Sequence, residues 1–258
     1  MKIKVYVLCY DDASKAAAHQ SFGHFTWASV LHIPSTLYLE NCMYGYLLEQ
    51  RLTEGDDWDT YDYVGTLSWK APHKIIIPDI HALARRLERD KGPGTPPSPD
   101  VVAFYFNTSR SSLTTQAKSH ALFNTIWFQL MDQLGLDAVT IDKTVRPFYS
   151  NYWIAKPSWM KKYIAFYKKA QHVMDTYTSI QTALWSNIGY PLSSSMNQTR
   201  CLEVFSRPYY PYHPFICERL PCVFFTLQGA HIHYHTPPTN GTVKRANCRI
   251  VLGPHLKT

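Results

Sequence analysis

The stretch Tyr61-Asp-Tyr-Val-Gly-Thr-Leu-Ser-Trp-Lys-Ala-Pro-His-Lys, residues 61–74, decides how the rest of the chain is interpreted. Its first half is rich in β-branched and aromatic residues, which favour a strand. The run ends at Leu67 and is followed directly by polar and cationic side chains. Because ligands of open α/β sheets bind beyond the ends of such strands, the stretch predicts a buried strand that ends in a binding site.

Segments on both sides of this stretch predict strands that alternate with helices. Residues 2–10 and 101–106 are apolar runs that open into polar residues, as central strands do. Residues 119–134 and the segment from Ser158 onward carry apolar side chains at steps of three and four, which is typical of helices packed on a sheet. The alternation predicts an α/β fold with a central sheet flanked by helices, in a single domain of residues 1–258.

Less regular patterns complete the expected order of elements. The Pro- and Gly-rich residues 91–100 predict an exposed surface loop, with a domain boundary as the alternative. Part of residues 13–30 predicts a helix that Ile33-Pro34 brings to an end. Further helices are expected in residues 38–51 and 79–89, further strands in residues 222–227 and 230–235, and a short strand or extended segment in residues 151–157.

The composition indicates a globular protein that attracts anions. The chain of 258 residues has a formal net charge of +7, which favours nucleotides, nucleic acid, acidic glycans or membrane surfaces as partners. The densest basic cluster, Lys161, Lys162, Lys168 and Lys169, belongs to an amphipathic helix, so we do not expect a nucleic-acid partner. The aromatic content of 14% suits a cleft that stacks on sugars or bases, although an aromatic core explains most of these residues.

The apolar runs and the cysteines predict a cytoplasmic location. No run of about 18 apolar residues occurs, and the apolar run at the start of the chain is too short for the apolar region of a signal peptide. We therefore expect a soluble protein without a transmembrane segment. The six cysteines show no Cys-x-x-Cys spacing, which predicts reduced, buried thiols.

The absence of several well-known motifs argues against several classes of enzyme. The chain has no glycine-rich phosphate loop, which argues against kinases, ATPases and dinucleotide enzymes. It also lacks the Gly-x-Ser-x-Gly elbow and the spacing of zinc proteases. Polar strand ends, aromatic residues and positive charge together favour a nucleotide-dependent transferase.

Three blocks carry a resemblance to a known family: Tyr61-Asp-Tyr-Val-Gly-Thr-Leu-Ser-Trp-Lys, Asn151-Tyr-Trp-Ile-Ala-Lys-Pro-Ser-Trp-Met-Lys-Lys-Tyr-Ile and His213-Pro-Phe-Ile-Cys-Glu-Arg-Leu-Pro. Short as they are, they span most of the chain in order. Together they resemble soluble glycosyltransferases of bacterial polysaccharide clusters and large algal viruses (chlorovirus-type). The resemblance implies a GT-A-like (Rossmann-like) domain with a central mixed sheet flanked by helices. It also implies a nucleoside-diphosphate sugar donor, expected to be a UDP-sugar such as UDP-xylose, and a glycan or glycoprotein acceptor.

The donor residues follow from the first block only in part, because the bacterial relatives read Asp-Tyr-Val-Gly-x-x-His-Tyr-Arg where this chain has Ser68-Trp69-Lys70. A cation is retained at the strand end. Lys70, helped by His73 or Lys74, would neutralise charge on the departing diphosphate in place of a metal. The alternative is a surface lysine that follows an edge strand. The expected donor-binding residues are Tyr10, Asp11, Asp12, Ser68, Trp69, Lys70 and His73.

Glu218 is the expected general base, which takes the proton of the acceptor hydroxyl in an inverting displacement. Its aromatic surroundings would shield it from water. In the alternative interpretation Glu218 and Arg219 cap a helix or form a buried ion pair. The expected acceptor-binding residues are Asn151, Trp153, Tyr212, His213 and Arg219.

Two patterns raise the question of a metal. Asp57-Trp58-Asp59 matches the Asp-x-Asp of metal-dependent sugar-nucleotide enzymes, but it precedes the strand, which favours a solvated turn. His231, His233 and His235 alternate and would share one face of a strand. Contact with the diphosphate, or no role, is the preferred interpretation, and zinc or manganese binding stays open. We assign no metal ligands, and Mn²⁺ or Mg²⁺ stays open as a cofactor. A non-catalytic carbohydrate- or nucleotide-binding module is the alternative function.

Overall fold

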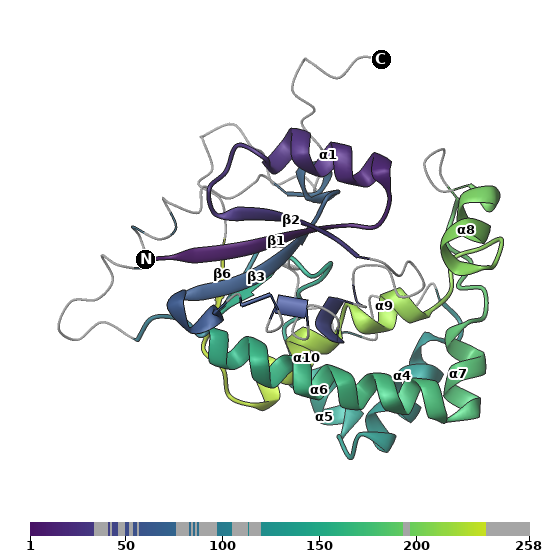
Figure 1. Ribbon diagram of the computed structural model, residues 1–258. Coiled ribbons are helices and arrows are strands. Elements are labelled where there is room, and N and C mark those ends of the chain that lie inside the picture. Colours follow the sequence, from purple (N-terminus) through teal and green to yellow (C-terminus); the bar gives the residue numbers. More distant parts are fainter. Residues whose placement is uncertain are drawn as a thin grey trace, which may run out of the picture.

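A computed structural model describes residues 1–33, 41, 43–45, 50–51, 54–55, 57–75, 83, 85, 87, 97–104, 113, 120–192 and 197–235. Its centre is a six-stranded mixed sheet of order β2-β1-β3-β5-β4-β6, with helices on both faces (Figure 1). This arrangement confirms the predicted α/β fold with a central mixed sheet. The strands are β1 (Ile3–Cys9), β2 (Ala28–His32), β3 (Tyr63–Ser68), β4 (Val101–Ala103), β5 (Trp153–Ala155) and β6 (Ile232–Tyr234).

One strand of the sheet runs against the others. β1 pairs in parallel with β2 and β3, and β4 pairs in parallel with β6. β5 lies between β3 and β4 and is antiparallel to both. The C-terminal ends of the parallel strands and the beginning of β5 therefore meet along one side of the sheet, which we call the carboxyl edge.

β3 confirms the strand predicted at the start of the chain's central stretch, and all six of its residues are buried. Gly65 lies opposite Ile154 of β5. A Cβ atom at Gly65 would lie 2.4 Å from the carbonyl oxygen of Trp153, so the glycine allows the two strands to approach. The Thr66 hydroxyl donates a hydrogen bond of 2.8 Å to the carbonyl of Asn151 and ties β3 to the segment before β5.

Helix α1 (Asp12–Phe22) forms the first crossover of the sheet and connects β1 to the parallel strand β2. Asp11 caps α1, since its carboxylate accepts the backbone N–H of Ser14 at 2.6 Å and its own N–H donates to the Ser14 hydroxyl at 3.0 Å. The helix predicted within residues 13–30 is thus confirmed as far as Phe22. β2 was not predicted from the sequence, because this short edge strand is mostly half-buried and lacks a continuous apolar run.

The opposite face of the sheet carries most of the helices (Figure 1). α4 confirms the helix predicted within residues 119–134, and α6 confirms the helix predicted from Ser158 onward. The helices after α1 are α4 (Phe123–Gln133), α5 (Ala138–Thr144), α6 (Pro157–Thr176), α7 (Thr178–Leu184), α8 (Gln198–Phe205), α9 (His213–Cys217) and α10 (Leu220–Leu227), with the 3-10 turns η2 (Trp58–Thr60) and η3 (Ala71–His73).

The predicted terminal strands have different outcomes. Residues 222–227 form part of helix α10, so the prediction of a strand was wrong there. An apolar run that is buried on all sides does not reveal its period, and Pro221 suits the first turn of a helix. The strand predicted in residues 230–235 is confirmed as β6, which pairs with β4.

Some expectations fall partly outside the described residues. Among residues 38–51 and 79–89, the described residues 43–45, 50–51, 83, 85 and 87 are helical. Residues 91–96 of the predicted loop and residues 105–106 of the predicted strand lie outside. Within the described part of the chain, no helix has the length and apolar character that crossing a membrane requires.

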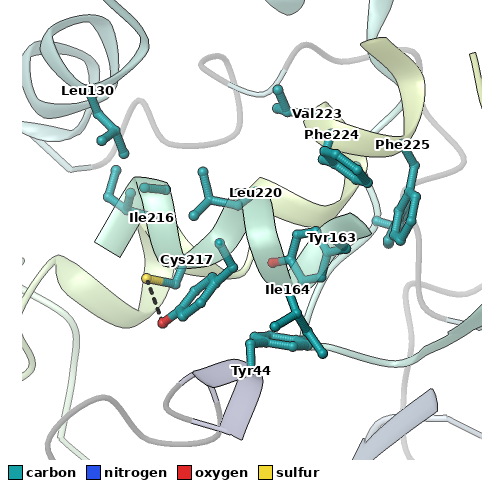
Figure 2. Close-up of a cluster of buried hydrophobic side chains, with 14 of the residues drawn as sticks. Tyr44, Leu130, Tyr163, Ile164, Ile216, Cys217, Leu220, Val223, Phe224 and Phe225 are labelled. Carbon is teal, nitrogen blue, oxygen red and sulfur yellow. Dashed lines mark hydrogen bonds between the residues drawn. The ribbon is translucent and has the colours of Figure 1, made fainter. Parts of the chain in front are cut away.

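Aromatic side chains fill the core on the face that carries α4, α6 and α10. Figure 2 shows Tyr163 and Ile164 of α6 beside Leu220 and Phe225 of α10. Tyr44 packs edge-on against Tyr163 at 4.8 Å between ring centroids. A smaller core lies between the sheet and α1. Much of the aromatic content is therefore core, and the described cysteines Cys9, Cys201, Cys217 and Cys222 are free and buried, as predicted.

Candidate functional site

The predicted donor residues of the first and third strands meet at the carboxyl edge. Leu8 of β1 lies opposite Ser68 of β3, and the backbone N–H of Trp69 donates to the carbonyl of Leu8 at 3.1 Å. This register brings the rings of Tyr10 and Trp69 together edge to face, 6.3 Å apart at an angle of 73°. The two aromatic side chains form one wall of the edge.

Trp69 has a hydrogen-bond donor without an acceptor. Its indole Nε1 is buried and makes no hydrogen bond in the part of the chain that the structure describes. A buried donor left in this way costs about 1–3 kcal/mol, which a ligand acceptor would recover. The ammonium group of Lys70 lies 5.0 Å from the Trp69 ring, so a cation stands beside this donor.

A strained turn enters the edge from the other side. Ser150 and Asn151 adopt left-handed φ angles of 64° and 56°. Such conformations cost roughly 1 kcal/mol or more each and persist only where the surroundings hold them. Lys74 donates to the Ser150 hydroxyl at 3.3 Å and lies 5.7 Å from the ring of Tyr152. Lys74 therefore reaches the edge as well as Lys70.

Two of the predicted ligand contacts stabilise this edge from within. The buried Asn151 side chain accepts from the Tyr44 hydroxyl at 2.7 Å and donates to Asn41 at 3.0 Å. The amide thus holds the turn, and its role in binding an acceptor stays a prediction. Ser68 is also buried, and its hydroxyl accepts the backbone N–H of Lys70 at 3.2 Å. Ser68 shapes the loop that carries Lys70.

Asp11 has partners within the fold at both carboxylate oxygens, and its role in binding the donor stays a prediction. One carboxylate oxygen caps α1, and the other forms an ion pair with Arg200 of α8. The Arg200 guanidinium lies 6.0 Å from the Tyr10 ring and also binds Glu203 at 2.6 Å. Arg200 was missed in the sequence because 189 positions separate it from Asp11 along the chain. Asp12 and His73 are exposed on α1 and η3, where no contact with the aromatic wall supports or contradicts their predicted roles.

Three predicted acceptor residues belong to the core. Trp153 is 0% exposed and packs between Tyr44 and Phe225, at ring distances of 5.9 and 5.1 Å. Tyr212 is 2% exposed, and its hydroxyl accepts the backbone N–H of Leu122. His213 is 1% exposed. Their burial leaves these side chains little surface for contact with a sugar, and their acceptor-binding roles stay predictions.

The buried pair His213 and Cys217 looks like a catalytic dyad but lacks its charges. The Cys217 sulfur lies 3.6 Å from Nε2 of His213. Burial lowers the pKa of His213 to about 3 and raises the pKa of the Cys217 thiol well above its usual range. Both groups are neutral at neutral pH, whereas a nucleophilic cysteine requires a thiolate. The pair is therefore structural.

Glu218 and Arg219 lie between α9 and α10 without forming the buried ion pair of the structural interpretation. Glu218 is the C-cap of α9 and is half-buried, and its N–H donates to the carbonyl of Pro214 at 3.0 Å. Arg219 is buried and forms no ion pair within the described part of the chain. The role of Glu218 as general base stays a prediction.

An open cleft of about 630 Å³ lies beside α7. The Trp185 ring stacks on His213 at 5.2 Å, and the guanidinium of Arg207 lies 4.9 Å from the same Trp185 ring. The sequence singled out residues 209–221 but gave no reason to join them to α7. The cleft is lined by Asp175, Gln181, Thr182, Trp185, Ser186, Arg207 and Tyr209.

The aspartates of one suspected metal pattern are engaged within the protein, and two histidines of the other lie near each other. Asp57 caps η2, and Asp59 binds Lys161 at 2.8 Å, as expected of an acidic turn. The rings of His233 and His235 lie 6.2 Å apart on and beside β6. Among the residues that the structure describes, no three His, Cys, Asp or Glu side chains are grouped to hold a metal ion.

Comparisons of the chain with protein-family models, with curated proteins and with solved structures gave no match. The fold and the site define an α/β protein whose carboxyl edge combines an aromatic wall with two lysines. The function proposed below is therefore based on the side chains at this edge.

Proposed function

We propose that the protein is a glycosyltransferase that moves a sugar from a nucleoside-diphosphate sugar, in particular a UDP-sugar, to a hydroxyl of a glycan. One observation supports this proposal: the segments that carry the family resemblance lie together at the carboxyl edge. β3 of the first segment pairs with β5 of the second, and Arg219 of the third lies 5.3 Å from the ring of Tyr149, just before the second.

The donor is expected to bind across the aromatic wall and the lysines. A uracil base would stack against Tyr10 and Trp69, since aromatic rings bind the faces of other planar rings. Lys70 and Lys74 would neutralise the charge that develops on the diphosphate as its bond to the sugar breaks. This arrangement assigns the leaving-group charge to lysines, and a parallel assay with Mn²⁺ tests whether a metal ion contributes.

The acceptor is expected in the cleft beside α7. Aromatic edges, hydroxyls and an amide are the groups with which protein clefts bind sugars. In the proposed reaction the acceptor oxygen bonds to the anomeric carbon, the bond to the diphosphate oxygen breaks, and Glu218 takes the hydroxyl proton. In this proposal Trp185, Arg207 and Tyr209 of the cleft contact the acceptor, since Trp153 and Tyr212 are buried.

Release of UDP from a panel of UDP-sugars tests the proposal. The substitutions Lys70→Met and Lys74→Met should each lower the rate about 10- to 100-fold, because each removes one charge that stabilises the leaving group. Lys162→Met is the matched control, since Lys162 is exposed on α6 and contacts Trp159. Rates that are equal in all three variants would contradict the proposed role of the edge.

A non-catalytic nucleotide-binding module is the second candidate. The burial of three predicted acceptor residues favours it, since it leaves the binding of a donor better supported than transfer to an acceptor. UDP that raises the melting temperature, together with no UDP release from any sugar tested, would identify a module.

A further inference from the structure

Arg219 is a buried cation between α9 and α10. The residue is 7% exposed, and its Nη1 donates to the carbonyl of Phe215. The guanidinium carbon lies 4.7 Å from the ring of Phe123 and 5.3 Å from the ring of Tyr149. One carbonyl and two aromatic faces thus surround the charge.

These contacts leave the guanidinium incompletely satisfied. Among the described residues no carboxylate forms an ion pair with Arg219, and its buried Nε has no hydrogen-bond acceptor. Burial lowers the pKa of Arg219, and the charge of the neighbouring Glu218 opposes this effect only in part. Buried charges are normally paired, because the loss of hydration is costly.

We propose that Arg219 anchors an oxyanion site, in which a phosphate or carboxylate group of the ligand accepts the Nε–H bond and supplies the missing negative charge. A planar guanidinium suits this role because its donors match the geometry of both groups. The structural alternative is that Arg219 only caps the end of α9 through the Phe215 carbonyl.

A second cation lies close to the same segment. Tyr149 precedes Ser150, and Lys74 binds the Ser150 hydroxyl at 3.3 Å. Tyr152, over which Lys74 lies, packs in the core beside α1, whereas Phe123 packs in the core beside α4. Arg219 and Lys74 thus approach residues 149–152 from the two faces of the sheet, and an oxyanion beside Tyr149 would attract both.

Two sources would supply the oxyanion. Under the proposed function it is either the diphosphate of the donor or the carboxylate of an acidic sugar in the acceptor. The site itself follows from the buried charge and does not require that the protein transfers a sugar. Inorganic phosphate, UDP and glucuronate serve as probes that separate the sources.

Thermal unfolding of the full chain tests the site. For the wild type, at least one probe should raise the melting temperature by about 2–4 °C at ten times its dissociation constant. Arg219→Met should match or exceed the wild-type melting temperature without ligand, since replacing an incompletely compensated buried charge by an apolar side chain is often stabilising. It should also lose the ligand-induced rise. Arg146→Met is the control for net charge, because Arg146 is exposed over the ring of Tyr234.

A melting temperature of Arg219→Met several degrees below the wild type, with an unchanged response to the probes, would overturn the inference. If this variant loses both stability and its response to the probes, or does not fold, a measurement on the wild-type protein decides whether the site exists. The Arg219 Nε–H resonance, assigned with Arg219→Lys, should shift with at least one probe, and no shift with all three would reject the site. If only phosphate and UDP raise the melting temperature, the oxyanion is the diphosphate. If only glucuronate raises it, the oxyanion is the carboxylate of an acidic sugar. UDP release in the assay above is independent of these outcomes.

Discussion

The buried imidazole of His213 makes stability depend on pH. Its pKa is lowered to about 3 by burial, while an unfolded histidine titrates near 6.5. Between these values the unfolded chain binds the proton, so this contribution to stability is complete above about pH 6.5 and decreases as the pH falls. The slope is about 1.4 kcal/mol per pH unit.

Urea unfolding between pH 7 and pH 4 measures this slope. His213→Asn should remove most of it, whereas His73→Asn, which changes an exposed imidazole, should leave it unchanged. Equal slopes in the wild type and in His213→Asn would show that the imidazole is protonated in the folded protein as well.

The sequence predicts the position of a residue at the carboxyl edge where that residue directly follows a strand. Tyr10, Trp69 and Lys70 follow directly on strands and lie at the carboxyl edge. The burial of Trp153 was not predictable in this way. Its neighbour along the strand, Tyr152, packs on the α1 side, and both faces of the sheet are covered, so both side chains are buried. Sequence spacing shows on which face a residue lies but not whether another layer covers that face.

At the scale of elements, Gly65 limits how β3 and β5 pair. A methyl group there would meet the Trp153 carbonyl and the Ile154 side chain at 2.4 Å, which are too close for the strands to keep their spacing. We expect Gly65→Ala to destabilise the protein by about 1–3 kcal/mol, the usual cost of overpacking.

Chemical unfolding measures this cost, and Gly189→Ala is a useful comparison. Gly189 has a positive φ of 72° and open space around it, so its substitution is strained only in the backbone. A wild-type unfolding midpoint in Gly65→Ala would contradict the close approach of the two strands.

The elements that were missed share a physical cause. Edge strand β2 needs no apolar run because much of it is half-buried, and helix α10 is apolar all round because it lies under several neighbours. Periodicity predicts an element only where one side faces water and the other the core, as in α4 and α6.

At the scale of the whole molecule, the carboxyl edge and the cleft beside α7 share no lining residue among those described. Tyr209→Ala should therefore raise the KM for a glycan acceptor about 10-fold, or roughly 1.4 kcal/mol, and leave hydrolysis of the donor unchanged. Tyr190→Ala is the matched control, because Tyr190 is an exposed aromatic residue outside the cleft. A change in donor hydrolysis alone would place Tyr209 with the donor instead.

The overall arrangement also explains which contacts a sequence cannot reveal. The antiparallel direction of β5 places residues before a strand, rather than after it, at the ligand edge. Arg200 and Arg219 reach that edge or its neighbourhood through helices whose packing depends on the completed sheet. Local patterns predict the strands, and only the finished topology brings these cations to them.

Asp11 attaches two helices beside the carboxyl edge, and the two attachments differ in how they respond to salt. Its first oxygen holds the start of α1, and its second holds α8 through Arg200, with both partners about one-third exposed. Dissolved salt screens such partly exposed pairs and leaves a backbone cap largely intact. Rising ionic strength should therefore weaken the link between Asp11 and α8 while the cap of α1 stays intact, so the salt concentration acts on one of the two attachments that Asp11 makes beside the carboxyl edge.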